Sequence, residues 1–78
     1  MIIRILSPCV GWFYSKVKKG DKVKKGDLLA EIAVLSTDPY EILSPTDGII
    51  QEIMFDETGV EYKQRIIAID IPSPLAKK

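Results

Sequence analysis

The sequence contains no histidine and only one cysteine among its 78 residues. Without histidine, the chain lacks the side chain that most often acts as a general base near neutral pH, and it cannot form Ser-His or Cys-His nucleophile pairs. Cys9 has no second thiol or imidazole with which to form an intrachain disulfide or a zinc site. We therefore interpret Cys9 as a small, partly buried apolar residue, and we assign no catalytic residue and no metal ligand.

Net charge and long apolar runs are also missing. The chain carries 11 basic and 11 acidic side chains, so no overall field attracts nucleic acid or an anionic membrane. No apolar stretch approaches the roughly 20 residues that cross a bilayer, and residues 1–6, which include Arg4, are too short for a signal peptide. We expect a cytoplasmic protein with neither a nucleic-acid nor a membrane partner.

Charge is nevertheless distributed unevenly along the chain. Six lysines fall within one ten-residue stretch: Lys16, Lys18, Lys19, Lys22, Lys24 and Lys25. Such a cluster can dock an acidic partner, but lysine is also common in turns because turns are solvated. The stretch lacks the interleaved aromatic residues of a nucleic-acid surface. We therefore interpret the cluster as a solvated turn, and we interpret the acids Asp56, Glu57 and Glu61 in the same way.

Short segments rich in Ile, Val, Leu, Phe and Tyr alternate with Gly, Pro and Asp, which is typical of short strands. No window shows the apolar stripe of an amphipathic helix, so the predicted fold class is all-β. We expect strands over residues 2–6, 10–17, 28–34, 40–44, 48–55 and 65–70, with a short edge strand at Val23. Residues 1–72 are expected to form one domain, followed by a flexible tail over residues 73–78.

The chain contains an internal repeat, because a shift of 37 residues superposes its two halves without a gap. The shift places Ser7-Pro8 on Ser44-Pro45 and Gly11 on Gly48, where glycine allows a sharp bend or a close approach. The other matched pairs are apolar: Phe13 with Ile50, Val17 with Met54, Val23 with Val60, Leu29 with Ile66, and Ile32 with Ile69. We therefore expect two half-barrels that share one core about a pseudo-twofold axis.

Glycines also predict the turns within each half. Gly20 and Gly26 each precede an aspartate, and Gly-Asp pairs are typical of turns. The second half has Glu57 and Lys63 at the equivalent positions. We therefore expect the turns of that half to differ, with Gly59 taking the positive φ.

Several of these motifs together resemble the biotinyl/lipoyl carrier domains. The motifs are GDKVKKGDLL at residues 20–29 and SPTDGII at residues 44–50. The segment SPCVGWFY at residues 7–14 resembles the opening of the biotin carboxyl carrier subunit of acetyl-CoA carboxylase, an enzyme of fatty acid biosynthesis, and residues 60–66 resemble its closing strand pair. The resemblance covers about residues 4–71. It implies a flattened barrel or sandwich of two four-stranded antiparallel sheets with pseudo-twofold symmetry.

The resemblance also implies a position for cofactor attachment. In the family, a hairpin between the halves presents one lysine, which is joined to biotin or lipoate through an amide bond. The family's spacing places this position eleven residues before Gly48, at Thr37. A threonine supplies neither the amine nor the long arm, and no lysine lies between Lys25 and Lys63. We therefore expect no cofactor on this hairpin, whose tip also contains Ser36, Asp38 and Pro39.

Three functions are compatible with these observations. The first, which we favour, is a non-catalytic, non-biotinylated carrier-like module that docks on biotin carboxylase, carboxyltransferase or carrier subunits. The second is a lipoyl-like adaptor or scaffold domain, as in membrane-fusion proteins, although a long helical hairpin usually separates the halves there. The third is a carrier that is modified at another residue, such as Ser36.

Two aromatic residues are candidate contacts for a protein partner. Trp12 and Tyr14 lie in the predicted strand over residues 10–17, and Trp is enriched at the energetic centres of interfaces. Packing within the sheet is the alternative explanation for Trp12.

Overall fold

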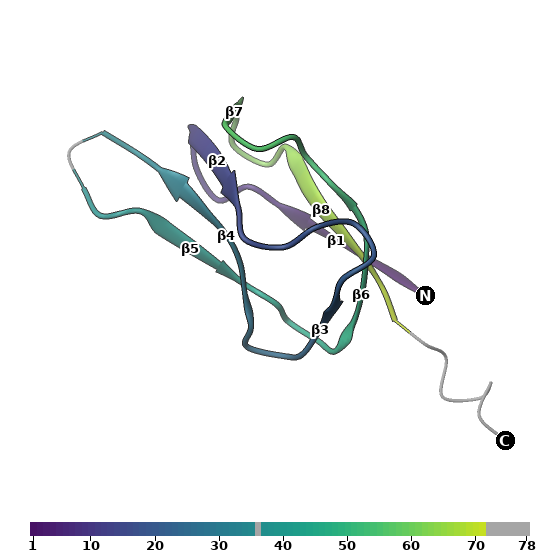
Figure 1. The fold of residues 1–78 in the computed structure, drawn as a ribbon. Coiled ribbons are helices and arrows are strands. Elements are labelled where there is room, and N and C mark those ends of the chain that lie inside the picture. Colours follow the sequence, from purple (N-terminus) through teal and green to yellow (C-terminus); the bar gives the residue numbers. More distant parts are fainter. Residues whose placement is uncertain (36, 72–78) are drawn as a thin grey trace, which may run out of the picture.

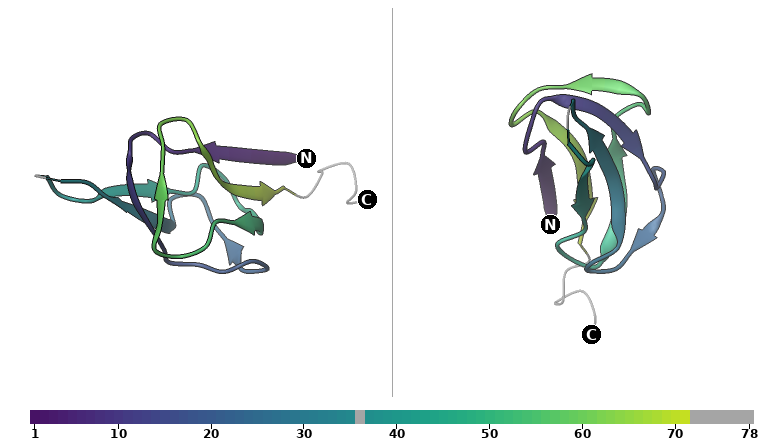
Figure 2. Two further views of the ribbon diagram at one scale, coloured as in Figure 1. Left: turned by 90° about the horizontal axis from the view of Figure 1, so that it is seen from above. Right: turned by 90° about the vertical axis from the view of Figure 1, so that its left-hand side faces the viewer.

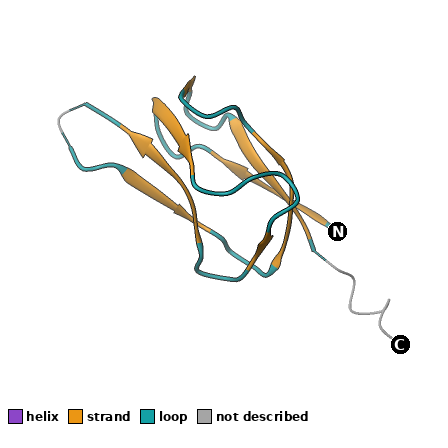
Figure 3. Ribbon diagram, in the orientation of Figure 1, coloured by secondary structure: helices purple, strands orange, loops and turns teal. Residues whose placement is uncertain are grey.

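The computed structural model describes residues 1–35 and 37–71 (Figure 1). These residues form eight strands: β1 (Ile2–Leu6), β2 (Gly11–Ser15), β3 (Lys22–Val23), β4 (Leu28–Ala33), β5 (Tyr40–Leu43), β6 (Gly48–Ile53), β7 (Thr58–Val60) and β8 (Arg65–Asp70). Strands and loops account for the whole described fold (Figure 3), which confirms the all-β prediction. The described residues include no helix with the length and hydrophobicity needed to cross a membrane. Ser36 and the predicted tail, residues 73–78, lie outside the described residues.

The strands form two four-stranded antiparallel sheets, with the orders β1-β8-β6-β3 and β5-β4-β2-β7. The two orders become identical when each strand of the first half is exchanged with its counterpart in the second half. The shift of 37 residues even carries the bounds of β4, Leu28–Ala33, onto those of β8, Arg65–Asp70. The repeat therefore corresponds to two half-barrels, as predicted.

The hairpin between β4 and β5 and the N-terminus lie at opposite ends of the barrel (Figure 2). Ile71, which follows β8, lies beside the N-terminus because its amide donates to the carbonyl oxygen of Met1 at 2.8 Å. The hairpin is therefore held away from the point where the described chain begins and ends.

Both halves contribute equivalent side chains to one core. The five predicted apolar pairs all enter it, and the buried members are Phe13, Val23, Leu29, Ile32, Ile50, Val60, Ile66 and Ile69. Val17 and Met54 are partly buried and pack against this core. Each fully buried Leu, Ile or Phe contributes about 1.5–3 kcal/mol relative to an exposed one. The burial confirms that the repeat matches core positions.

Gly48 is needed because β6 begins against the end of β8. A Cβ atom at this position would lie 2.5 Å from Cγ2 of Ile69 and 2.7 Å from the carbonyl oxygen of Asp70. Its counterpart Gly11 is similarly close to the carbonyl oxygen of Ala33. The predicted close approach is therefore present in both halves.

The prediction that Gly59 takes a positive φ is wrong. Glu57 and Lys63 themselves have φ values of 60° and 67°, matching Gly20 at 94° and Gly26 at 92°. Gly59 lies in β7, where it pairs with Trp12 instead of forming a turn.

Backbone hydrogen bonds explain why two non-glycine residues adopt this conformation. The amide of Glu57 donates to the carbonyl of Phe13 at 2.7 Å, just as the amide of Gly20 donates to that of Ile50 at 2.8 Å. The amide of Lys63 likewise donates to the carbonyl of Ser7 at 2.8 Å. The paired backbones therefore impose the same turns on both halves, although the second half lacks the glycines that suit them.

Candidate functional site

The hairpin between the halves is the region where the sequence predicted a site. Strands β4 and β5 pair from Leu28↔Leu43 to Ile32↔Tyr40, and the described residues between them, 34–35 and 37–39, lie beyond the ladder. Pro39 precedes β5, where its missing amide hydrogen costs no ladder hydrogen bond. The described residues of this connection extend past the body of the barrel (Figure 1).

Thr37 lies exposed on this connection, as do Asp38 and Pro39. The Oγ1 hydroxyl of Thr37 donates to the carbonyl oxygen of Asp38 at 2.9 Å, so its contact is local to the turn. A short β-branched hydroxyl side chain cannot form the amide that holds biotin or lipoate. The residues of this connection therefore do not fit a group that is attached through a lysine amine.

The lysines that flank this region in the sequence lie in other turns. Lys25 lies between β3 and β4, where its backbone amide donates to Oδ1 of Asp47 at 2.9 Å. Lys63 lies between β7 and β8, with Nζ 5.4 Å from the centroid of the Tyr62 ring. Neither lysine belongs to the hairpin.

An apolar groove of about 800 Å³ lies beside the base of the hairpin. It is lined by Val10, Gly11, Trp12, Ala33, Val34, Leu35, Gly59, Val60, Glu61 and Gln64. Three of its apolar side chains are strongly exposed: Trp12 at 55%, Val10 at 67% and Leu35 at 92%. Glu61 supplies the charge among these lining residues. The groove therefore offers an apolar surface with a carboxylate beside it.

Small neighbours on both sides shape the groove around Trp12. Trp12 pairs with Ala33 on β4 and with Gly59 on β7. A Cβ atom at Gly59 would meet Cζ3 of Trp12 at 3.8 Å, so the indole lies in contact range above this glycine. The large ring therefore stays at the surface, where it forms part of the groove.

The two aromatic candidates from the sequence have different surroundings. Trp12 lines the groove, whereas Tyr14 lies outside its lining and pairs with Glu31. Tyr14 is 38% exposed. Val10, Leu35 and Gly59 were missed in the sequence because their role depends on how β2 lies between β4 and β7. The sequence offered one signal for this surface, because Leu35 is an apolar residue that belongs to none of the matched core pairs.

The acidic residues near the turns bind backbone amides. Oδ1 of Asp56 accepts hydrogen bonds from the amides of Ser15 at 2.9 Å and Glu57 at 3.0 Å. Asp21 and Asp27 each accept one at 2.9 Å, from the amides of Lys18 and Lys24. These carboxylates stabilise turns, which gives Asp56 a structural role beyond solvation.

The two pseudo-symmetric sheets, with a hairpin between the halves, form the flattened barrel that the resemblance to biotinyl/lipoyl domains implied. The family model Biotin_lipoyl, described as "Biotin-requiring enzyme", matches residues 3–69. The chain therefore belongs to the biotinyl/lipoyl domain family. Domains of this family are carriers that interact with partner enzymes and are not themselves catalytic.

Two solved structures contain the same fold. One is a putative succinylglutamate desuccinylase/aspartoacylase family protein from Shewanella amazonensis SB2B, with a TM-score of 0.77 and 18% identity over 87% of this chain and 20% of that chain. The other is succinylglutamate desuccinylase/aspartoacylase from Rhodobacter sphaeroides, with a TM-score of 0.70 and 20% identity over 91% of this chain and 23% of that chain. A comparison with curated protein sequences gave no match. The chain thus spans about a fifth of the length of these two structures.

Proposed function

We propose that this chain is a carrier-like module that docks on a partner protein without carrying biotin or lipoate. The observation that carries the proposal is the exposed hairpin with Thr37, and no lysine, at the position expected for attachment. The apolar groove beside the hairpin supplies a surface that does not depend on a cofactor.

The groove has the composition of a protein-docking surface. Exposed Trp at the centre of an apolar patch is typical of the few residues that dominate binding energy. Trp12 has this placement, with Val10 and Leu35 exposed on the same groove. The partners that we propose are cytoplasmic biotin carboxylase, carboxyltransferase or carrier subunits, on which the module acts as a binding or regulatory domain.

A second candidate is an adaptor or accessory domain within a larger assembly. The two solved structures support this alternative because each contains the fold as about a fifth of a longer chain. The adaptor of a membrane-fusion protein is one form of this alternative. Partner binding distinguishes the two candidates, since only the first requires contact with carboxylase subunits.

Intact-mass analysis after co-expression with a biotin ligase and a lipoate ligase tests the absence of loading. We expect the unmodified mass with either ligase, because the hairpin offers no lysine amine. A natural carrier domain expressed in parallel shows that each ligase is active. An added mass of one biotinyl or lipoyl group on this chain would refute the proposal.

Binding to purified biotin carboxylase and carboxyltransferase tests the docking. Trp12 is the chain's one tryptophan and is half-exposed, so its emission reports burial of the groove. We expect a blue shift on binding of the parent chain, and isothermal titration calorimetry should show a loss of at least about tenfold in affinity for Trp12→Ala. Phe55→Ala is the matched control, because Phe55 is 87% exposed and lies outside the groove lining. Equal losses in both variants, or no binding to either subunit, would contradict docking through this groove.

A further inference from the structure

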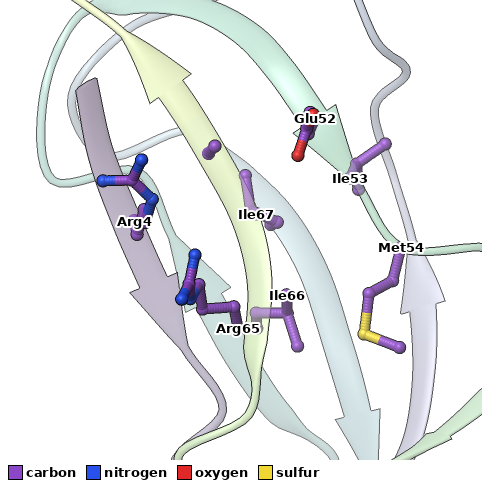
Figure 4. Close-up of a pocket in the computed structure, with 8 residues that line it drawn as sticks. Arg4, Glu52, Ile53, Met54, Arg65, Ile66 and Ile67 are labelled. Carbon is purple, nitrogen blue, oxygen red and sulfur yellow. The ribbon is translucent and has the colours of Figure 1, made fainter. Parts of the chain in front are cut away.

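A shallow cavity of about 180 Å³ lies on the sheet β1-β8-β6-β3 and shares no lining residue with the hairpin groove. Its lining includes the exposed side chains of Arg4, Arg65 and Glu52, together with Met54 and Ala68. Arg4 and Arg65 lie to one side of β8, and Glu52 and Met54 lie to the other (Figure 4). The cavity therefore has a basic side and a side with one carboxylate.

A bulge in β8 brings the two arginines to the same face. Arg4 pairs with Ala68 and Leu6 pairs with Arg65, while the register shifts between Ile5 and Leu6. Because successive residues of a strand point to opposite faces, Arg65 would face away from Ala68 without this extra residue. With it, Arg65 becomes a diagonal neighbour of Arg4, a relationship in which backbones are about 7–8 Å apart.

A second bulge breaks the pseudo-twofold symmetry at this same cavity. The register of β6 against β8 runs from Ile50↔Ile69 to Glu52↔Ala68, which leaves Gln51 as an extra residue. The equivalent strands β2 and β4 pair regularly through Ser15↔Ala30. The bulge turns Glu52 to the outer face beside Ala68 instead of the core face that Ile50 occupies. Bulges that re-aim a side chain in this way are frequent beside binding sites.

The arginine pair has no internal partner within the described part of the chain. The one ion pair found there joins the N-terminus to Asp70 at 3.9 Å, and no hydrogen bond satisfies the guanidinium of Arg4 or of Arg65. Glu52 pairs with the same Ala68 as Arg4, so two strand spacings, about 10 Å, separate their backbones. Two adjacent guanidinium groups thus present their donors to the cavity.

The fold itself does not require this pair. The shift of 37 residues places Glu41 on the other sheet at the position of Arg4, and Leu28 at the position of Arg65. The same scaffold therefore tolerates an acid and an apolar residue at these positions. The packing of the barrel therefore does not explain why two arginines lie together at this place.

We propose that Arg4 and Arg65 form a binding site for an oxyanion, either a phosphate or a carboxylate group. Guanidinium forks match both groups through paired, charge-assisted hydrogen bonds. The cavity of about 180 Å³ has room for such a group, since a water molecule takes about 30 Å³ of liquid. Ala68 provides a short floor between the strands. The proposal is independent of docking through the hairpin groove.

Titration of the isotopically labelled full chain with inorganic phosphate and with acetate, followed by amide NMR shifts, tests this site. We expect saturable shifts at Arg4, Arg65 and Ala68, with chloride at equal ionic strength giving none. Arg4→Gln and Arg65→Gln should each weaken phosphate binding by about tenfold, as expected for losing hydrogen bonds to a charged group. Glu52→Gln should tighten it about twofold, because a like charge is removed across about 10 Å of wet surface. A gain of affinity cannot result from unfolding.

Lys24→Gln is the matched control, since it removes one exposed positive charge outside the cavity. It should leave phosphate affinity within about twofold, because Lys24 does not line the cavity. Equal weakening by Lys24→Gln and the arginine variants, or shifts that never saturate, would overturn the site. A capped acidic peptide in the same titration distinguishes the source of the anion. Tighter binding of the peptide than of acetate assigns the site to a partner's carboxylates, and equal or weaker binding assigns it to a small free anion.

Discussion

The indole of Trp12 lies over Gly59, with Cζ3 at 3.8 Å from the position of a Cβ atom on residue 59. The two residues pair across β2 and β7, on the outer face of the barrel. This distance is ordinary van der Waals contact, so the glycine leaves a space that one methyl group fills without displacing the ring. Gly59 lines the groove and lies in the edge strand β7, so a substitution at this residue affects both the groove and the stability of β7.

Gly59→Ala should raise the free energy of unfolding by about 0.5 kcal/mol, because glycine in a strand costs conformational entropy. The matched change Gly48→Ala should lower it by about 3 kcal/mol, since the new methyl overlaps Ile69 and the backbone of Asp70. Urea denaturation followed by Trp12 emission measures both. Similar effects of the two substitutions would contradict the difference in close approach.

The positive φ values of Glu57 and Lys63 predict a second pair of stability changes. Lys63→Gly should raise the free energy of unfolding by about 0.5–1 kcal/mol, because a left-handed conformation costs a residue with a Cβ more than it costs glycine. The reciprocal change Gly26→Ala, at φ 92°, should lower it by about 1 kcal/mol. Chemical denaturation of the two variants beside the parent protein tests the prediction. Destabilisation by Lys63→Gly would show that the Lys63 contact with Tyr62 outweighs backbone strain.

The sequence predicts the architecture well because the repeat carries its own internal check. Matched apolar residues such as Phe13 and Ile50 could share a core only if both halves folded alike. The turn at Glu57 was predicted incorrectly because backbone pairing with Phe13 overrides the local preference for glycine. The bulge at Gln51 leaves no compositional signal, since it depends on the register with β8. The sequence likewise could not predict that Arg65 lies on the same face as Arg4, because this depends on the register shift between β1 and β8.

The candidate site was predicted only in part for a related reason. Thr37 and Trp12 were named from the sequence, Thr37 by the family's spacing to Gly48 and Trp12 because tryptophan is enriched at interfaces. Val10 and Leu35 were not, because they come to line one groove only when β4 pairs with β2. A groove is formed by neighbouring strands, and a single strand's sequence does not reveal it.

The buried serines Ser7 and Ser44 provide a test of the pseudo-symmetry. The Oγ hydroxyl of Ser7 donates to the carbonyl of Cys9 at 2.6 Å, and that of Ser44 donates to the carbonyl of Thr46 at the same distance. Each serine is almost fully buried. Ser7→Ala and Ser44→Ala should each lower the free energy of unfolding by about 1 kcal/mol, the usual net value of one such hydrogen bond.

The double variant Ser7→Ala/Ser44→Ala should lose the sum of the two single effects, because the serines share no hydrogen-bond partner. Thermal and urea unfolding of all three variants measure this. A large difference between the single variants would mean that one turn stabilises the barrel more than its counterpart does.

Grafting a biotinylation motif onto the hairpin tests what separates this chain from a loadable carrier. The triple change Ser36→Met, Thr37→Lys and Asp38→Met places an amine at the exposed position on the connection between β4 and β5. If the tip alone prevents loading, co-expression with a biotin ligase should add the mass of one biotinyl group. Ser36→Met with Asp38→Met, keeping Thr37, is the control and should remain unmodified.

The result separates two reasons for the lack of loading that we propose. A ligase must recognise the folded barrel around the tip as well as the lysine itself, so loading of the triple variant would show that this surface is still intact. If a triple variant with native Trp12 emission stays unmodified, the exposed apolar surface at Leu35 and Trp12 becomes the next feature to change. Leu35→Glu in the triple background then asks whether the surface that we propose for docking is also the one that excludes the ligase.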